Sequence, residues 1–395
     1  MEICKSEICT GCAVCLDVCS KHCITMQPDQ LSSVHPVVDM EQCIDCGLCK
    51  KVCPNNNVIE LHAHKEVYAA WSNDEVQRAT SASGGVAYEL YRYMINSGGV
   101  GAGVTLDEMG CHFILLENET DIVRTKNSKY VFVNADGIYI QIKNKLLKGQ
   151  KVLFIGLPCH VAGLYSFLRG KTDGLYSIDI ICHGLAPYEY LNQHIQNIER
   201  RKRTKTNSVS FRNPILGTDN YFFSLSDSED KVFYAKKVTS YDAYQLGYHH
   251  ALIYRENCYR CKYARQERVG DLTIGDFSGL GRETPFLYTK GNLNCVICNT
   301  DKGRFLIENT KDAISYIERP TDEAFKYEHQ LSAPPIRHSQ KDTFNRIYTR
   351  THSFRKATNG SLWYDRLKVP MEADIIQKWT IRLPKRILNY MRRKL

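Results

Sequence analysis

Cys9-Thr10-Gly11-Cys12-Ala13-Val14-Cys15-Leu16-Asp17-Val18-Cys19 is the first of two stretches that place four cysteines at intervals of two, two and three residues. The second stretch is Cys43-Ile44-Asp45-Cys46-Gly47-Leu48-Cys49-Lys50-Lys51-Val52-Cys53, and Pro54 follows it. Thiolates at such close spacing bind metal. Zinc sites are tetrahedral and are usually built from pairs of C-x2-C, so two runs of four cysteines supply more thiolates than zinc needs. The pattern therefore favours iron–sulfur clusters over zinc.

The intervals within each run are those of bacterial ferredoxins that hold two 4Fe-4S clusters. In that arrangement three cysteines of one run bind one cluster and the fourth binds the other. We therefore expect two ligand sets, which are Cys9, Cys12, Cys15 and Cys53 for the first cluster and Cys43, Cys46, Cys49 and Cys19 for the second. Cys4 and Cys23 fall outside the repeat, and we interpret them as packed thiols rather than ligands.

The start of the chain favours reduced thiols over disulfides. Met1 is followed directly by Glu2 and Ile3, without the apolar run behind a basic start that marks a secretory signal. Disulfides would require an oxidising compartment. No stretch of about 18 uncharged apolar residues is present, so no membrane-spanning helix is expected. The sequence predicts a cytoplasmic protein.

The charge is unevenly distributed along the chain. The first 62 residues contain eight acidic residues and four lysines, whereas the whole chain of 395 residues has a net charge of +9. An acidic segment on a basic body can attract partners, although solvated charge is the ordinary interpretation. The basic run 200–205 has no interleaved aromatic residues and no nucleic-acid-binding motif, so we expect no nucleic acid partner.

The C-terminus is strongly basic. Residues 382–395 contain six Lys or Arg and no acid, with apolar residues at roughly helical spacing. A basic amphipathic helix of this kind binds anionic membranes, which would make the protein peripheral at the inner membrane face. A solvated terminal helix is the favoured alternative, because Pro384 interrupts the pattern.

A second kind of sequence begins near Val67, where strand and helix patterns alternate. The small, hydroxyl-rich loop Thr80–Gly85 precedes apolar residues at helical spacing, so it opens a helix at Val86. Such a loop brings backbone amides close to a phosphate at the positive end of the helix. A plain Ser-Gly helix cap without a ligand explains the loop about equally well.

Two predicted strands end close to cysteines. The strand 152–155 leads to Cys159, and the strand 176–181 leads to Cys182. Ligands bind at the carboxyl ends of parallel strands, so these thiols are well placed for chemistry. Cys258 and Cys261 add a C-x2-C pair. Buried apolar thiols and a zinc-binding pair are the alternative, and the other cysteines outside the runs that compete for such a role are Cys111, Cys295 and Cys298.

The chain resembles the coenzyme F420 hydrogenase/dehydrogenase beta subunits, which are flavin and iron–sulfur proteins of archaea and bacteria. The resemblance covers about residues 67–310, with the ferredoxin-like segment fused in front. The motifs that carry it, in order, are Ala70-Trp71-Ser72 with Asp74 and Arg78, Ser81 to Gly85, Ser128-Lys129-Tyr130, Gly156-x-Pro158-Cys159, Cys182-x-Gly184, Phe211-Arg212, Cys258-x-x-Cys261 and Gly275-Asp276.

The resemblance implies non-covalently bound FAD and a third 4Fe-4S cluster beside it. The implied flavin contacts are Ser81, Ser83, Gly84, Gly85, Ser128, Lys129, Tyr130, Gly156 and Pro158. The implied ligands of the inner cluster are Cys159, Cys182, Cys258 and Cys261. A flavin is the converter that such a chain needs, because clusters carry one electron at a time and hydride chemistry moves two.

We expect an α+β or α/β fold. The predicted parts are a dicluster ferredoxin-like domain at 1–62, the two parts of a flavin-binding domain with a mixed β-sheet at 63–148 and 149–320, and a basic C-terminal extension at 321–395.

The predicted function is an oxidoreductase that couples one-electron transfer from ferredoxin or another redox partner to two-electron chemistry on an organic small molecule. Similarity to family members that carry a fused ferredoxin segment suggests that the substrate is linked to a glycan and that the reaction belongs to surface-polysaccharide biosynthesis. The alternative is an electron-transfer subunit that passes electrons to a partner enzyme and has no organic substrate of its own.

Overall fold

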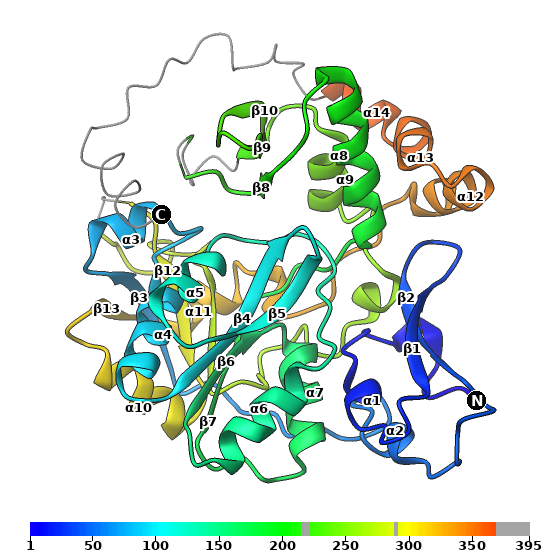
Figure 1. The fold of residues 1–395 in the computed structure, drawn as a ribbon. Helices are drawn as coiled ribbons and strands as arrows, with labels where there is room; N and C mark the ends of the chain where they lie inside the picture. The colour runs from blue at the N-terminus through cyan, green and yellow to red at the C-terminus, as the bar shows by residue number, and fades with distance from the viewer. Residues whose placement is uncertain (215, 217–221, 288–290, 369–395) are drawn as a thin grey trace.

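The computed structural model describes residues 1–214, 216, 222–287 and 291–368, and Figure 1 shows their arrangement. A small N-terminal part lies beside a large central sheet, and a group of helices lies above that sheet in this view. The chain is therefore organised around one extended sheet, as the alternation of strand and helix patterns predicts.

The N-terminal part is a compact arrangement of short elements. It contains η1 (Ser6–Ile8), α1 (Val14–Asp17), β1 (Ile24–Pro28), β2 (Val34–Val38) and α2 (Leu48–Lys51). The two strands pair antiparallel, with Ile24 opposite Val38. Gly11 and Gly47 have φ angles of +70° and +69°, a left-handed conformation that glycine adopts without a steric penalty. Each cysteine run can thus turn sharply before its short helix.

The central sheet has eight strands in the order β13-β3-β12-β11-β7-β6-β4-β5. The strands are β3 (Glu66–Ser72), β4 (Val100–Asp107), β5 (Gly110–Leu116), β6 (Val152–Gly156), β7 (Leu175–Ile180), β11 (Leu272–Asp276), β12 (Asn294–Cys298) and β13 (Ile314–Arg319). The pairs β4–β6, β6–β7 and β7–β11 are parallel, and the outer pairs are antiparallel. The sheet is therefore mixed, as expected.

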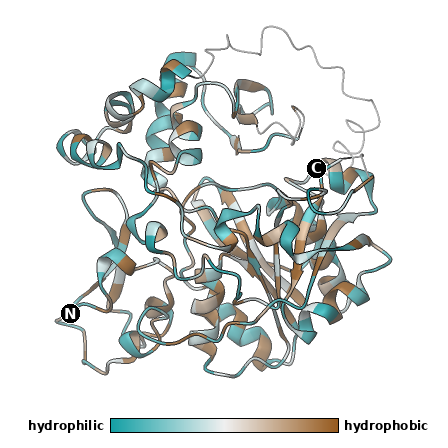
Figure 2. Ribbon diagram, turned by 180° about the vertical axis from the view of Figure 1, so that it is seen from behind, coloured by the Kyte–Doolittle hydropathy of each residue, from teal (hydrophilic) through white to brown (hydrophobic). Residues whose placement is uncertain are grey.

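Helices cover both faces of this sheet. They are α3 (Glu75–Ala79), α4 (Val86–Asn96), α5 (Glu119–Arg124), α6 (Ile138–Leu147), α7 (Pro158–Leu168), α10 (Asp301–Asn309) and α11 (Thr321–Phe325). One core packs α6 and α7 against the sheet, and a second core packs α4, α5 and α10 against the other face. Figure 2 shows the hydrophobic strands enclosed between these helices. β6 is buried along its whole length, which explains its uninterrupted apolar sequence.

A smaller layer lies beyond the sheet. It contains the three-stranded sheet β10-β9-β8 and several helices. Its elements are α8 (Tyr188–Lys202), β8 (Ser208–Ser210), β9 (Phe222–Ser226), β10 (Val232–Lys237), α9 (Ala243–His249), η2 (Glu256–Arg260), α12 (Lys341–Thr351), α13 (Phe354–Ser361) and α14 (Trp363–Lys368), whereas η3 (His329–Leu331) packs with α11 on the central sheet. Tyr190 of α8 stacks on Phe354 of α13, with the ring centroids 5.5 Å apart. The segment after residue 320, in which sequence patterns weaken, thus contributes to the core.

The N-terminal part is fastened to the body by polar contacts. The Asp17 carboxylate accepts hydrogen bonds from the backbone amides of Gly137 and Tyr139, at 2.8 and 3.1 Å, and so caps the start of α6. The Tyr139 hydroxyl donates to the carbonyl of Cys12 at 2.9 Å. The first cysteine run therefore lies against the start of α6.

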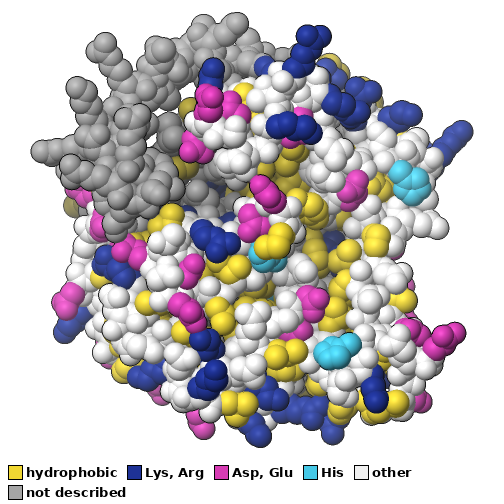
Figure 3. Space-filling view, viewed as in Figure 1, with side chains coloured by type: hydrophobic (Ala, Val, Ile, Leu, Met, Phe, Trp, Pro, Cys, Tyr) yellow, Lys and Arg dark blue, Asp and Glu magenta, His cyan; other side chains and the backbone are white. Residues whose placement is uncertain are grey.

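The surface in Figure 3 shows many Lys and Arg side chains over the upper helices and along the lower edge. No helix among the described residues is both long and apolar enough to cross a membrane. The predicted basic helix at 382–395 lies outside the described residues.

Candidate functional site

The two cysteine runs assemble into two separate groups. The thiols of Cys9, Cys12 and Cys53 lie close enough to Cys15 to raise its pKa, after the larger effect of burial. Cys19, Cys43, Cys46 and Cys49 line one small cavity beside the start of α2. The fourth cysteine of each run lies with the other run, as the ferredoxin arrangement requires. Cys46 is exposed, so the second group is the one nearer to solvent.

Two further thiols lie directly beside these groups. Cys4 interacts with Cys9 and Cys53, and the Sγ atoms of Cys19 and Cys23 are 3.5 Å apart. Both belong to the small apolar core of the N-terminal part. Their positions agree with packed thiols, and spacing alone gives no sign that they adjoin the ligand sets.

A third group of thiols lies where the body meets the N-terminal part. Four cysteines, Cys159, Cys182, Cys258 and Cys261, line a cavity of about 160 Å³. Ile8, Thr10 and Asn55 of the N-terminal part line the same cavity. Burial raises the pKa of the Cys159 thiol, and the thiols of Cys182, Cys261, Cys12 and Cys258 act in the same direction. The structure therefore brings all four sequence-predicted cysteines together.

Local topology explains this convergence. β6 and β7 are parallel neighbours joined by α7, so their carboxyl ends meet at one edge of the sheet. Cys159 is the second residue of α7, and Cys182 follows β7 by two residues. Cys258 lies in η2 and Cys261 directly follows it. The competing cysteines Cys111, Cys295 and Cys298 lie elsewhere: Cys111 is in β5, and Cys295 and Cys298 face different cores from β12.

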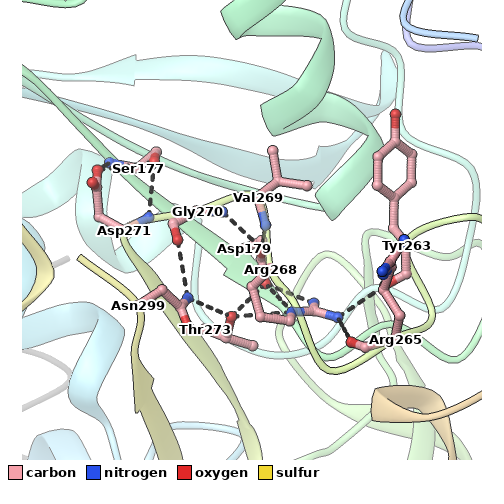
Figure 4. A network of polar contacts seen from close by, with 10 residues as sticks. All are labelled: Ser177, Asp179, Tyr263, Arg265, Arg268, Val269, Gly270, Asp271, Thr273 and Asn299. Atoms are coloured by element: carbon pink, nitrogen blue, oxygen red, sulfur yellow. Dashed lines mark hydrogen bonds and ion pairs between the residues drawn. The ribbon is translucent and has the colours of Figure 1, made fainter. Parts of the chain in front are cut away.

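A buried ion pair holds the loop that carries Cys261 against the sheet (Figure 4). Arg268 contacts Asp179 of β7 at 2.7 Å, and their side chains are 2% and 0% exposed. The other guanidinium nitrogen donates to the carbonyl of Tyr263 at 3.0 Å. Asp179 also accepts from the amides of Val269 and Gly270. Because Arg268 lines the cysteine cavity as well, this network fixes one wall of it.

The donor set of this cavity fits an iron–sulfur cluster. Four thiols converge on it, and no Asp or Glu is among its lining residues. Three cations, Arg260, Lys262 and Arg268, line it instead. A 4Fe-4S cluster with four thiolates is anionic, so a cationic lining stabilises it.

A larger cavity of about 390 Å³ adjoins the cysteine cavity at the same edge of the sheet. Leu157, His183 and Leu185 line both cavities. The predicted flavin contacts that line the large cavity are Ser81, Ser83, Gly85, Ser128, Lys129, Tyr130 and Gly156. Gly84 and Pro158 do not line it: Pro158 faces the cysteine cavity, and a Cβ on Gly84 would lie 2.6 Å from the carbonyl of Ala70.

The hydroxyl-rich loop does not cap α4 with a serine. The residue before the helix is Gly85 in a left-handed conformation, and no side chain of that residue caps the helix. The Ser83 hydroxyl donates instead to the carbonyl of Leu293 at 2.6 Å, and that of Ser81 to the carbonyl of Gln77 at 2.7 Å. Among the first amides, that of Val86 donates to the Asn294 side chain at 3.3 Å. Gly85 is therefore the N-cap residue and the hydroxyls of Ser81 and Ser83 bond within the chain, so a helix cap without a ligand stays an alternative to phosphate binding.

Two lysines with low pKa values line the large cavity. Desolvation lowers the pKa of Lys126 and of Lys129 to about 8 each. The Lys129 ammonium donates to the carbonyls of Thr125 and Lys126, at 2.6 and 2.8 Å. Lys126 donates to the Thr80 hydroxyl at 2.7 Å. Two cations bonded to neutral oxygens favour binding of an anion, and the sequence pattern indicates Lys129 but not Lys126.

Arg212 closes another side of the large cavity. It forms a two-point ion pair with Asp276, at 2.5 and 3.0 Å, and donates to the Tyr130 hydroxyl at 2.7 Å. Tyr130 stacks on Tyr248, with the ring centroids 4.7 Å apart. The aromatic surface and the fixed ion pair give the cavity a rigid wall of the kind that holds a planar ring.

One other group of metal-ligand residue types occurs among the described residues, at His250, His338 and Asp365. Nδ1 of His338 accepts the Gln340 amide at 3.1 Å, and its Nε2 faces Asp365 at 3.7 Å. We interpret this group as a polar contact that fastens α14.

Three family models match the chain. The model "4Fe-4S dicluster domain" matches residues 8–57. The model of the N-terminal part of the "Coenzyme F420 hydrogenase/dehydrogenase, beta subunit" matches residues 67–137, and the model of its C-terminal part matches residues 149–324. Their matched segments contain every cysteine assigned above to a cluster.

Two characterised relatives are similar to part of this chain. One of the subunits of the "F(420)H(2) dehydrogenase" of Methanosarcina mazei is 24% identical over 181 residues, covering 41% of this chain and 50% of the relative. The "Coenzyme F420-dependent sulfite reductase" of Methanocaldococcus jannaschii is 27% identical over 173 residues, covering 41% of this chain and 26% of the relative. The matches thus span half or less of either relative.

A solved F420-reducing [NiFe] hydrogenase complex from Methanosarcina barkeri contains a chain that is similar at 12% identity. The likeness covers 77% of this chain and 94% of that chain, with a TM-score of 0.41. This value is too low to support an argument about function.

Proposed function

Because the chain belongs to the coenzyme F420 hydrogenase/dehydrogenase beta-subunit family and carries a 4Fe-4S dicluster domain, we propose that it is an iron–sulfur electron-transfer subunit of an oxidoreductase. In this proposal the N-terminal clusters exchange electrons with ferredoxin or another redox partner. The large cavity holds FAD, and a partner enzyme completes the reaction.

This relay interpretation, in which the chain passes electrons to a partner enzyme, replaces the interpretation in which the chain itself acts on an organic substrate. The named relatives are a dehydrogenase subunit and a sulfite reductase, and they support electron transfer better than a role in surface-polysaccharide biosynthesis. Coenzyme F420 belongs to those relatives by name; for this chain, its use is part of the proposal.

A single observation carries the proposal: the sites that would hold one-electron and two-electron cofactors adjoin each other. The cavity of the four cysteines shares Leu157, His183 and Leu185 with the large cavity, and Ile8, Thr10 and Asn55 connect it to the N-terminal part. When bound, the clusters supply one-electron transfer, and FAD supplies the change between one and two electrons. In this proposal the chain's own residues hold these groups at adjoining positions.

The experiment compares the purified, iron-loaded chain with and without its partner enzyme. Reduced ferredoxin should bleach the flavin absorbance of the chain alone, whereas turnover of the final substrate should appear only after the partner is added. Turnover of an organic substrate by the chain alone would refute the relay interpretation. Full iron content without any flavin absorbance would refute the assignment of the large cavity.

Lys129 offers a prediction for the flavin site. Replacing Lys129 with methionine should weaken FAD binding by about 1 to 3 kcal/mol, or roughly 5- to 150-fold in Kd, because a charge-assisted hydrogen bond is lost. The measurement is FAD titration by fluorescence quenching. Lys148→Met is the matched control, since Lys148 is exposed and does not line the cavity. An unchanged Kd in the Lys129 variant would mean that its ammonium does not contact the flavin.

The same lysines predict a pH dependence. Lys126 and Lys129 carry charge below their pKa of about 8 and lose it above. An anion that needs the charged form should bind with constant affinity below pH 8 and progressively more weakly above it. FAD titrations between about pH 6.5 and 9.5 measure this, and the decline should be smaller in Lys129→Met. Affinity that increases with pH would contradict the prediction.

A further inference from the structure

Arg255 is a fully buried cation between the N-terminal part and the body. Its side chain lies among the largest buried groups, with the whole residue 2% exposed. Nη2 donates to the carbonyls of Cys9 and Val34, at 3.3 and 3.0 Å, and Nε donates to the Asn257 side chain at 3.2 Å. The guanidinium lies over the Phe132 ring, 4.8 Å from its centroid. Every one of these partners is neutral.

The charge of Arg255 has no carboxylate partner within ion-pair distance among the described residues. Its Nη1 is buried and has no hydrogen-bond partner. Asp29 is the acid that acts on it, but Asp29 already contacts His35 at 3.3 Å. An unpaired buried cation costs several kcal/mol, so a compensating anion is expected nearby.

The thiols around Arg255 indicate where that anion lies. Burial lowers the pKa of the guanidinium, whereas the thiols of Cys9, Cys258 and Cys159 act in the opposite direction. Cys9 belongs to the first ferredoxin set, and the other two belong to the inner set. Hydrogen bonds also tie Arg255 to one residue of each set, since Nη2 donates to the carbonyl of Cys9 at 3.3 Å and the Arg255 carbonyl accepts the amide of Cys258 at 3.0 Å.

We propose that Arg255 is a positioning residue for electron transfer, whose fixed positive charge lies between the first ferredoxin cluster and the inner cluster and makes both easier to reduce. This inference rests on the proposed function, because it needs clusters at both cysteine sets. A cluster gains one negative charge when it accepts an electron, and a nearby buried cation stabilises that reduced form. One electron leaves one cluster and enters the other, and no bond or proton changes place.

The second ferredoxin cluster provides an internal control. Its expected ligands Cys43, Cys46, Cys49 and Cys19 are neither hydrogen-bonded to the Arg255 side chain nor among the groups that act most strongly on it. Neutralising Arg255 should therefore change two of the three reduction potentials and leave the third in place. A merely structural role would change iron content or all three potentials together.

The test uses the full chain, reconstituted anaerobically and titrated electrochemically with EPR detection. In Arg255→Gln, the equilibrium for reduction of the first and inner clusters should become at least about tenfold less favourable, which is 59 mV for a one-electron couple. The second cluster should keep its potential. Arg265→Gln is the matched control, because it removes an exposed charge from a neighbouring loop, and it should change none of the three.

Two results would overturn the role of Arg255. One is an unchanged potential of the first and inner clusters in a fully iron-loaded Arg255→Gln protein, and the other is an equal shift of all three. Where Arg255→Gln retains less iron, Arg255→Lys decides: because it keeps the positive charge, it should leave the same two potentials close to those of the wild type, and a fall of about 59 mV or more in both overturns the proposal. A wild-type protein with fewer than three reducible clusters would instead refute the proposed function.

Discussion

Replacing Arg268 with alanine should lower the free energy of unfolding by about 3 to 5 kcal/mol, because it leaves a buried carboxylate without its partner. Asp179 is 0% exposed, and Arg268 contacts it at 2.7 Å. Removal of the guanidinium would also free the carbonyl of Tyr263, which it binds at 3.0 Å. The loop from Cys261 to Arg268 would then lose its main attachment to β7.

The same change should disturb the inner cysteine site. Because Arg268 anchors the residues that directly follow Cys261, we expect Arg268→Ala to retain less iron than the wild type even at temperatures where it is folded. Denaturant unfolding followed by circular dichroism measures the stability, and iron analysis after anaerobic reconstitution measures the loading. The loss of iron should come from the inner cluster, whose EPR signal should decrease first.

Arg265 on the same loop is the control for this prediction. Its guanidinium lies in an exposed pair with Glu267, so Arg265→Ala should leave the unfolding midpoint and the iron content nearly unchanged. A small loss of stability in Arg268→Ala, similar to that of Arg265→Ala, would contradict the role assigned to the buried network. So would a large loss of stability with the inner cluster fully retained.

The sequence locates the cysteines well because their information is local. The spacing of Cys43, Cys46 and Cys49 is determined within seven residues, and the metal chemistry follows from it. A rule about strand ends indicates Cys159 and Cys182, and the parallel pairing of β6 and β7 agrees with that rule. In each case a short segment of the chain is enough to predict where the cysteine lies.

The groups that act on these cysteines cannot be predicted in the same way, because they depend on distant contacts. Arg268 and Asp179 are 89 residues apart, and Arg255 is 246 residues from Cys9. In sequence, each arginine is one of many cations that are ordinarily solvated. Only the fold shows that these two are buried, and the position of Lys126 beside Lys129 in the large cavity is hidden from the sequence for the same reason.

The C-terminal helices show a different limit. α12 buries Phe344 and Tyr348, four residues apart, together with Lys341, in a segment that is mostly polar. Its packing on Tyr190 comes from aromatic contacts with a helix about 150 residues earlier. The helical spacing of Phe344, Ile347 and Tyr348 is present in the sequence, but only the fold shows which distant aromatic side chains this face covers.

Replacing Cys261 with alanine should abolish reduction of the flavin by ferredoxin while leaving the N-terminal clusters in place. The wild-type chain should contain about twelve iron atoms from three clusters, and the variant about eight. Cys261 lines the inner cavity together with Cys159, Cys182 and Cys258, and no other cysteine of the described residues lines it. Since a cluster with three protein ligands is easily lost, one substitution should remove all four iron atoms.

The measurements for Cys261→Ala are iron content and stopped-flow flavin reduction, with EPR of the N-terminal clusters as a test of integrity. Cys295→Ala is the matched control, because it removes a buried thiol that faces a different core from β12. It should keep about twelve iron atoms and normal flavin reduction. If Cys261→Ala keeps its full iron complement, the inner cluster is not where we place it. If it loses four iron atoms but still reduces flavin, the inner cluster is not on the path from the N-terminal clusters to the large cavity.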